Sequence, residues 1–407
     1  MTTASPAAPT AIDPAIAAIA ERMRAAHATK TPVRIVGAGT WLDAGHPVRA
    51  GLTRLEMTEV RGIVEYVPGD LTLTALAGTT LAELDAATRE HGQRLALDPF
   101  GGDAGTIGAT VATASAGTLS GTFGTPRDVV LGLAVVTGAG EVIRAGGRVV
   151  KNVAGFDLVR LNAGAWGTLG AIAEVTVRLR ALPAVDATYA IALEGGDARV
   201  PQAVAALRAL PFTYDAIELL DPTTARELGI VPGVQGTLLV RAAGTPTLVH
   251  AMHEALRVAG AAREVGSDAW ATLRTLEPAG SATVRFSHAA TRVADVWLAS
   301  RRLAERAGGW AHLSVGRTVA RITVPRAPQE TADAFGARIG SALDYAVRGF
   351  DGACIAERVP PRSWSAKALQ RPPVSATLAQ LERRMRAAFD PAHLLNPGIL
   401  GAAGGEG

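Results

Sequence analysis

The sequence predicts an α+β fold in two domains, and two observations support this prediction. A chain of 407 residues exceeds the usual size of a single hydrophobic core. The pattern of expected secondary structure also changes near Pro183. Short segments of alternating hydrophobicity and glycine-rich loops precede this residue, whereas strands alternate with long helices after it. Hydrophobic residues make up 48% of the chain and charged residues 19%, which is enough apolar material for two cores.

The expected elements before Pro183 follow from apolar spacing and turn residues. They are, in order, a helix over 15–28, strands over 33–36, 63–67 and 71–77, a helix over 80–91, a hairpin of 129–136 and 141–144, and a strand over 171–179. After it we expect helices over 200–209, 248–260, 293–307, 331–347 and 375–389, with strands that include 236–241 and 282–288.

Residues 99–124 form a run dense in glycine and other small residues. Glycine leaves no Cβ between backbone amides and a ligand, so such a loop can approach a large anionic cofactor closely. A Rossmann site does not fit, because Gly37-Ala38-Gly39 lacks its third glycine and no helical pattern follows it. The G-x-x-x-x-G-K-[ST] phosphate loop is absent as well.

Several motifs follow one another in a characteristic order: VRIVGAGTW, GTIGATVATASAG, KNVAGFD, GTLGAI and a terminal FDPAHLLNPGIL. In this order the chain resembles the vanillyl-alcohol-oxidase superfamily with its PCMH-type FAD-binding domain, and most closely the smaller flavin-binding subunits of glycolate oxidases. The resemblance implies a leader and helix over 1–30, a two-subdomain FAD-binding domain over 31–185, an α+β cap (substrate) domain over 186–374, and a C-terminal helix and tail over 375–407 that returns to the FAD domain.

The resemblance also implies which residues bind FAD. They are Gly37, Ala38, Gly39, Thr40 and Trp41 in the first loop, Thr106, Ile107, Gly108, Ala109, Thr113, Ser115 and Gly117 in the second, and Lys151 and Ile172 further on. We expect the FAD to be non-covalent, because His46 does not stand in a tethering motif. Lys151 faces either the flavin or, as a structural alternative, a carboxylate such as Asp157.

Some positions depart from the pattern of the family. Ala38, Ala109 and Ala114 stand where glycine is usual, and alanine adopts positive φ only at a cost, so weaker FAD binding is a possible consequence. Trp166 replaces an acidic or small residue and is expected to be a core tryptophan. Asp128, next to Arg127, is expected to order the glycine loop through local hydrogen bonds.

The sequence assigns no catalytic residue and no metal site. The eight histidines form none of the histidine-rich clusters found in catalytic relatives, and His250 and His253 lack the glutamate of a zinc motif. The single cysteine, Cys354, excludes an internal disulfide and an iron–sulfur cluster held by this chain alone. No basic run with interleaved aromatic residues suggests nucleic acid, and no apolar stretch suggests a membrane span, so we expect a cytoplasmic protein that is at most peripheral to a membrane.

The function that these expectations favour is that of an FAD-binding subunit of a heteromeric glycolate dehydrogenase. Such a subunit works beside a catalytic flavin subunit and an iron–sulfur subunit, and electrons pass to quinone. One alternative is a stand-alone FAD-dependent enzyme for another alcohol or 2-hydroxy acid, with His288 as base and Arg285, Arg317 or Arg321 binding a carboxylate. The other is a scaffold that has lost FAD.

Overall fold

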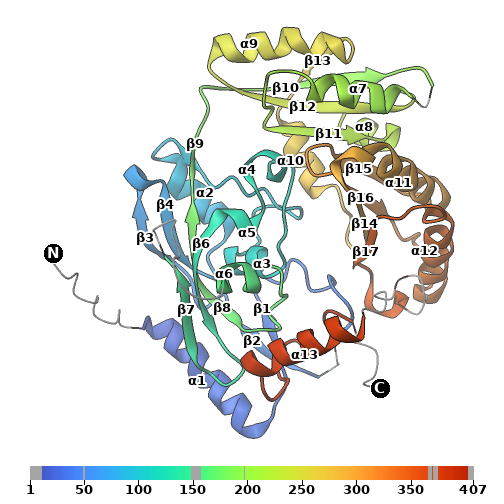
Figure 1. Cartoon of the computed structure of the whole chain (residues 1–407). Coiled ribbons are helices and arrows are strands. Elements are labelled where there is room, and N and C mark those ends of the chain that lie inside the picture. Colours follow the sequence, from blue (N-terminus) through green and yellow to red (C-terminus); the bar gives the residue numbers. More distant parts are fainter. Residues whose placement is uncertain are drawn as a thin grey trace.

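The structure is a computed structural model that describes residues 12–48, 51–147, 157–196, 198–364, 369 and 375–401. Figure 1 shows two bodies joined near residue 183. We call residues 12–181 the N-terminal unit and residues 185–364 the C-terminal unit. The strands and helices of both units confirm the predicted α+β fold.

The N-terminal unit begins with a helix that covers a small parallel sheet. Helix α1 (Pro14–Thr29) starts where the Asp13 carboxylate accepts a hydrogen bond from the backbone N–H of Ala15. Its apolar face, with Ile16, Ile19 and Met23, shares one core with residues of β1 (Val33–Val36) and β2 (Thr53–Glu56), which pair in parallel. This pairing fixes the position of the loop that follows β1.

A five-stranded antiparallel sheet forms the rest of this unit. Its strand order is β3 (Ile63–Val67), β4 (Thr72–Leu76), β8 (Ala171–Arg178), β6 (Val130–Val136) and β7 (Val142–Gly146). The helices around it are α2 (Leu81–Arg89), α3 (Ile107–Ala112), α4 (Ser120–Phe123), α5 (Pro126–Val129) and α6 (Leu158–Asn162), and β5 (Gln93–Arg94) pairs with β9 (Arg180–Ala181). Buried residues of α2, α3 and the sheet make one core.

The C-terminal unit is built on an eight-stranded antiparallel sheet. Its order is β13 (Ala262–Val265), β10 (Val185–Leu193), β12 (Gly236–Gly244), β11 (Ala216–Leu220), β15 (Trp310–Ser314), β16 (Val319–Val324), β14 (Ala282–Ser287) and β17 (Ala353–Arg358). One face packs on α7 (Arg199–Arg208), α9 (Pro246–Ala255), α11 (Val293–Ala307) and α12 (Ala332–Ala346) in the largest core of the molecule.

Within the C-terminal unit, helices cover one part of the opposite face of this sheet. Helices α8 (Pro222–Glu227) and α10 (Asp268–Thr275) bury their apolar residues against β10, β11 and β12. Over the central strands, polar residues take alternate positions: His312 on β15 pairs with Arg321 on β16, which pairs with Arg285 on β14. Because side chains alternate between the two faces of a strand, this register places all three on one face.

The last described segment, residues 390–401, contacts the N-terminal unit. Helix α13 (Ala376–Phe389) has no buried residue, but the segment after it crosses back to β1. The Val33 N–H donates to the carbonyl of Leu394 (2.8 Å), and the Asp390 carboxylate accepts hydrogen bonds from the N–H groups of Leu394 and Leu395. The C-terminal segment thereby becomes a wall beside the loop that follows β1.

Candidate functional site

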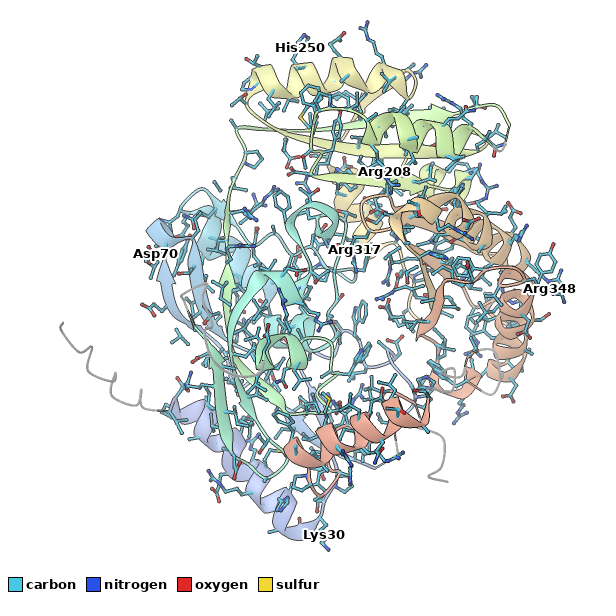
Figure 2. All side chains as sticks on the ribbon, viewed as in Figure 1. Lys30, Asp70, Arg208, His250, Arg317 and Arg348 are labelled. Atoms are coloured by element: carbon cyan, nitrogen blue, oxygen red, sulfur yellow. The ribbon has the colours of Figure 1, made fainter. Side chains whose placement is uncertain are left out.

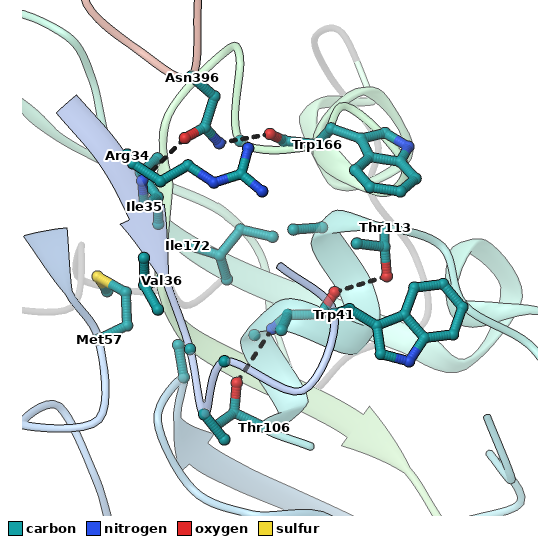
Figure 3. A pocket seen from close by; sticks show the side chains of 18 of the residues that line it. Arg34, Ile35, Val36, Trp41, Met57, Thr106, Thr113, Trp166, Ile172 and Asn396 are labelled. Carbon is teal, nitrogen blue, oxygen red and sulfur yellow. Dashed lines mark hydrogen bonds between the residues drawn. The ribbon is translucent and has the colours of Figure 1, made fainter. Parts of the chain in front are cut away.

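Two cavities adjoin the loops that the sequence singles out. The first cavity holds about 750 Å³ of space, part of it open to solvent. It is lined by residues of β1, the loop after it, α3, the turn into β8 and the C-terminal segment (Figure 3). Most of this lining is backbone and small apolar side chains, as a closely wrapped ligand requires.

The glycine loop after β1 packs tightly on the start of α3. A Cβ on Gly37 would lie 2.5 Å from the Thr106 hydroxyl, which itself caps α3 by accepting from the Ala109 N–H (3.3 Å). Gly39 has φ +76°, a conformation that favours glycine. The loop therefore depends on glycine at both positions.

Asn396 joins three distant segments at one side of the first cavity. Its carbonyl oxygen accepts from the Ile35 N–H (2.8 Å), and its amide nitrogen donates to the Trp166 carbonyl (2.7 Å), as Figure 3 shows. These two bonds satisfy backbone groups of β1 and of the turn into β8, so the side chain fixes their spacing.

Arg34 is the charged residue among those described around the first cavity. Figure 3 shows it extending from β1 toward the space between Asn396 and Ile172. Its Nη1 is buried and has no hydrogen-bond partner, and burial lowers the pKa of the guanidinium. A buried donor without a partner is costly, so this residue fits a ligand that brings an acceptor or a negative charge. An FAD molecule, with its pyrophosphate and carbonyl groups, meets that requirement.

Most of the residues expected to bind FAD lie together around the first cavity. Those that line it are Gly37, Ala38, Gly39, Thr40, Trp41, Thr106, Gly108, Ala109, Thr113 and Ile172. Ile107 is fully buried beneath it in the core of the unit, Ser115 is buried outside its lining, and Gly117 lines the second cavity. Lys151 lies outside the described residues, whereas Asp157, its alternative partner, is described and pairs with Arg160 (3.6 Å). Arg34, Asn396 and Ile399 were not expected in the lining.

The alanines that replace glycines differ in backbone conformation. Of the three, only Ala114 has positive φ (+49°), whereas Ala109 lies within α3 and Ala38 is not in the left-handed region. The strain of an alanine at positive φ therefore falls on one position, just after α3. This removes two of the three reasons for suspecting a scaffold without FAD.

The expectation for Trp166 is wrong, and that for Asp128 is confirmed. Trp166 is only partly buried, has φ +55° and lines the first cavity, because the turn into β8 directs it away from the core. The Asp128 carboxylate accepts from the N–H and the hydroxyl of Thr125 (2.9 and 2.8 Å), which orders the end of the glycine-rich loop locally.

The second cavity lies between the two units, against the polar face of the eight-stranded sheet. It holds about 310 Å³ of space, part of it open to solvent. Its lining consists of Phe100, Ala116 and Gly117 from the N-terminal unit and Glu218, Arg285, His312, Ser314, Arg317, Val319 and Arg321 from the C-terminal unit. Pockets at domain interfaces are common sites for small ligands.

One wall of the second cavity is a histidine–carboxylate pair. His312 Nδ1 lies 2.8 Å from Glu218 Oε2, and both side chains are buried. Burial raises the pKa of Glu218, and the bond to His312 acts against this shift. His312 Nε2 makes no hydrogen bond to a described residue, so this nitrogen is available on a ring whose orientation Glu218 fixes.

Arginines bonded to glutamates lie beside this pair, with Arg285 and Arg321 on the same face of the sheet as His312. Arg321 donates to both Glu277 and Glu357, and Arg285 Nη1 donates to Glu357 (2.6 Å). Burial by itself would raise the pKa of Glu357, but Arg285 and Arg321 lower it to about 2. Arg317 is different: it donates to the Ser120 hydroxyl (3.2 Å) and forms no ion pair with a described carboxylate.

His288, which the sequence suggested as a base, is excluded from this site. Its Nδ1 accepts from the Ala289 N–H (2.7 Å), its Nε2 bonds Asp351 (2.9 Å), and it does not line the second cavity. Arg285 and His288 are three residues apart, so a strand would direct them to opposite faces. Alternation along β11 and β15 is the signal that identifies Glu218 and His312 instead.

Aromatic side chains lie between the two cavities. The Arg321 guanidinium lies 4.3 Å from the Phe100 ring centroid and 5.9 Å from that of Trp41, and Trp41 also lines the first cavity. Arg358 binds Asp43 beside the same loop (2.9 Å). The first loop is thus tied to the arginines of the second cavity.

Two classes of site are absent from the described ranges. No group of three or more His, Cys, Asp or Glu residues among them is arranged to hold a metal ion. None of their helices is long and apolar enough to cross a membrane.

Comparison with known proteins agrees with the first cavity. The family model described as "FAD binding domain" matches residues 15–146. The glycolate oxidase subunit GlcE of Escherichia coli is 41% identical over 167 residues, 41% of this chain and 47% of that protein. The glycolate oxidase subunit GlcD of Bacillus subtilis is 32% identical over 53% of this chain and 47% of that protein. The chain therefore spans about half the length of these curated relatives.

Solved structures extend the likeness in fold to nearly the whole chain. A p-cresol methylhydroxylase structure superposes with a TM-score of 0.69 at 16% identity, covering 95% of this chain and 87% of that one. An alkyldihydroxyacetonephosphate synthase structure gives 0.67 at 16% identity, covering 93% and 74%. Residues 15–146 thus match an FAD-binding domain, and the chain has the α+β fold of PCMH-type FAD-binding structures.

Proposed function

We propose that this chain is an FAD-binding subunit of a heteromeric glycolate dehydrogenase that converts glycolate to glyoxylate. The observation that carries the proposal is the first cavity, in which the glycine loop, α3 and an unpartnered Arg34 donor adjoin one another inside the matched FAD-binding domain. The similarity to GlcE over 41% of the chain supports glycolate as the substrate.

The cofactor residues follow from this geometry. The backbone of Gly37–Thr40, the Thr106 end of α3 and Arg34 would hold the anionic and carbonyl groups of FAD, with Ile172 as an apolar contact. When bound, FAD supplies a two-electron acceptor. We propose non-covalent attachment, because none of the described residues that line the first cavity is His, Cys or Tyr.

The proposed partner subunits are inferred from the iron–sulfur ligands that this chain lacks. Its one cysteine, Cys354, is partly buried, and burial raises the pKa of its thiol to about 12. A single thiol with little thiolate character cannot hold an iron–sulfur cluster. We therefore propose that a separate iron–sulfur subunit carries electrons toward quinone, beside a catalytic flavin subunit.

The experiment that tests this proposal starts from an absorbance spectrum of the purified chain, with FAD added if the protein is colourless. Glycolate and D-lactate are then added anaerobically, first to the chain alone and then to the chain co-purified with its partner subunits. Flavin that stays oxidised alone and is reduced in the complex supports the proposal. Failure to bind FAD under any condition contradicts it.

A second candidate function is a stand-alone FAD-dependent oxidation of a 2-hydroxy acid or alcohol. The second cavity favours this candidate, because its His312 nitrogen and its arginines adjoin one another without any partner chain. Reduction of bound flavin by substrate in the isolated chain distinguishes this candidate from the first.

A further inference from the structure

The three arginines of the second cavity differ in how much of their hydrogen-bonding capacity is already used. Arg321 is nearly fully buried and bonded to Glu277 and Glu357 on two sides. Arg285 shares Glu357, and its Nε is buried without a partner. Arg317 has a single hydrogen bond, to Ser120. The ion pairs thus use the hydrogen-bonding capacity of Arg321, whereas part of that capacity stays unused on Arg285 and Arg317 among the described residues.

Arg317 is the arginine of this group whose charge is compensated least directly. Arg285 and Arg321 form ion pairs with Glu357, and Arg321 also with Glu277, whereas Arg317 forms no ion pair with a described carboxylate. Burial and the nearby Arg285 lower the pKa of Arg317, and Glu218, Glu357 and Asp128 act in the opposite direction without a direct ion pair, so its charge is only partly compensated. A carboxylate or another small anion in the cavity would compensate it.

The histidine–carboxylate pair beside these arginines supplies a group of a different kind. Because Glu218 engages Nδ1 of His312, a proton on Nδ1 leaves a lone pair on Nε2. That nitrogen then accepts a hydrogen bond from a hydroxyl group. A ligand that satisfies both the arginine and the histidine therefore carries a carboxylate and a hydroxyl close together.

We propose that the second cavity binds a small 2-hydroxycarboxylate, with Arg317 pairing its carboxylate and His312 Nε2 accepting from its hydroxyl. The ligand class rests on the proposed function, whereas the assignment of Arg317 and His312 rests on the contacts above. Glu218 is then a positioning residue, which fixes the ring and the proton on Nδ1. Figure 2 places Arg317 where the two units meet.

Binding is measured by calorimetry on the full-length chain with two probes. The first, 2-hydroxyisobutyrate, has no hydrogen on its hydroxyl-bearing carbon and cannot be oxidised there; the second, isobutyrate, lacks the hydroxyl. The unmodified chain is expected to bind the hydroxy acid more tightly. Arg317→Met is expected to weaken both probes about ten- to a hundred-fold. His312→Phe, which keeps a ring but has no acceptor, is expected to remove the preference for the hydroxyl and to leave isobutyrate affinity unchanged.

Matched controls use exposed residues of the same unit. Arg257→Met removes an equal charge, and His250→Phe makes the same exchange as His312→Phe on the outer helix α9 (Figure 2). Both are expected to bind the probes as the unmodified chain does. Arg317→Lys retains the charge without the fork, so intermediate affinity is expected if Arg317→Met fails to fold.

FAD occupancy is measured by absorbance in the same samples, which separates the two proposals. Probe binding as expected in a chain that never takes up FAD refutes the proposed function and leaves this inference standing. Normal FAD binding with no probe binding, or with Arg317→Met indistinguishable from the unmodified chain, overturns the inference. Probe binding that FAD abolishes also overturns it, because the cavity then holds part of the cofactor.

Discussion

Replacing Arg34 with methionine tests the first cavity directly, because the two explanations for this residue predict opposite changes. Methionine preserves much of the apolar stem but removes the guanidinium with its unpartnered, buried Nη1. A hydrogen bond to a charged group contributes about 1.5–3 kcal/mol. If Arg34 donates to FAD, the variant is expected to bind FAD about 10- to 150-fold more weakly.

The cofactor-free protein is expected to respond in the other direction. A buried donor without a partner costs about 1–3 kcal/mol, so removing it relieves a penalty that exists only while the cavity lacks a ligand. The melting temperature of FAD-free Arg34→Met is therefore expected to equal or exceed that of the unmodified protein. An arginine with a purely structural role would lower it.

The assay pairs a titration of cofactor-free protein with FAD, followed by flavin fluorescence, with thermal unfolding of the same samples. Arg54→Met is the matched control, since Arg54 is the register neighbour of Arg34 on β2, is exposed, and pairs with Glu56 (2.7 Å). An FAD dissociation constant within twofold of the original, together with a lower melting temperature, refutes the reasoning. Equal weakening in both variants points to a general effect of charge.

Three further predictions follow from contacts elsewhere. Gly37→Ala places a methyl group 2.5 Å from the Thr106 hydroxyl, so it is expected to lower the free energy of unfolding by about 1–3 kcal/mol and to weaken FAD binding. An unchanged FAD titration would contradict this prediction and would mean that the loop moves to accept the methyl group. The pKa of Glu357 is lowered from 4.5 to about 2, so its ionised form stabilises the fold above pH 4.5 and this contribution disappears as the pH falls toward 2. Glu357→Gln is expected to melt lower at pH 7 and to lose less on acidification, whereas parallel pH profiles would contradict this. Arg94→Met removes the partner of the buried Asp215 carboxylate between the units. The free energy of unfolding measured in urea is therefore expected to fall by about 3–5 kcal/mol, and a fall below about 1 kcal/mol would count against that contact.

Much of the fold could be predicted because local patterns decide it. Helix α11 runs over Val293–Ala307, the bounds that apolar spacing indicated, and β3 and β4 flank the expected turn. The short helices α3 to α6 were not predicted, since four to six residues show too little periodicity. The strand order of the large sheet could not be derived either, because pairing β15 between β11 and β16 depends on contacts far apart in sequence.

The first cavity was more accessible to sequence reasoning than the second. Its glycine loop and the start of α3 are contiguous motifs, whereas Asn396 and Arg34 join it through the pairing around β1. In the second cavity Arg285, Arg317 and Arg321 were recognised as a group, but the histidine that the sequence suggested with them, His288, was the wrong one. His312 reaches the cavity through strand register, which no local motif encodes.

The bond between Asn396 and β1 has a consequence for how the protein is made. Ile35, whose N–H donates this hydrogen bond, precedes Asn396 by 361 residues in the sequence. At a synthesis rate of about 5–20 residues per second, roughly 20–70 s separate the emergence of β1 from that of Asn396. The first cavity thus gains the wall that Asn396 forms only after the intervening residues have been made, so that cofactor loading through this wall must follow the synthesis of both units.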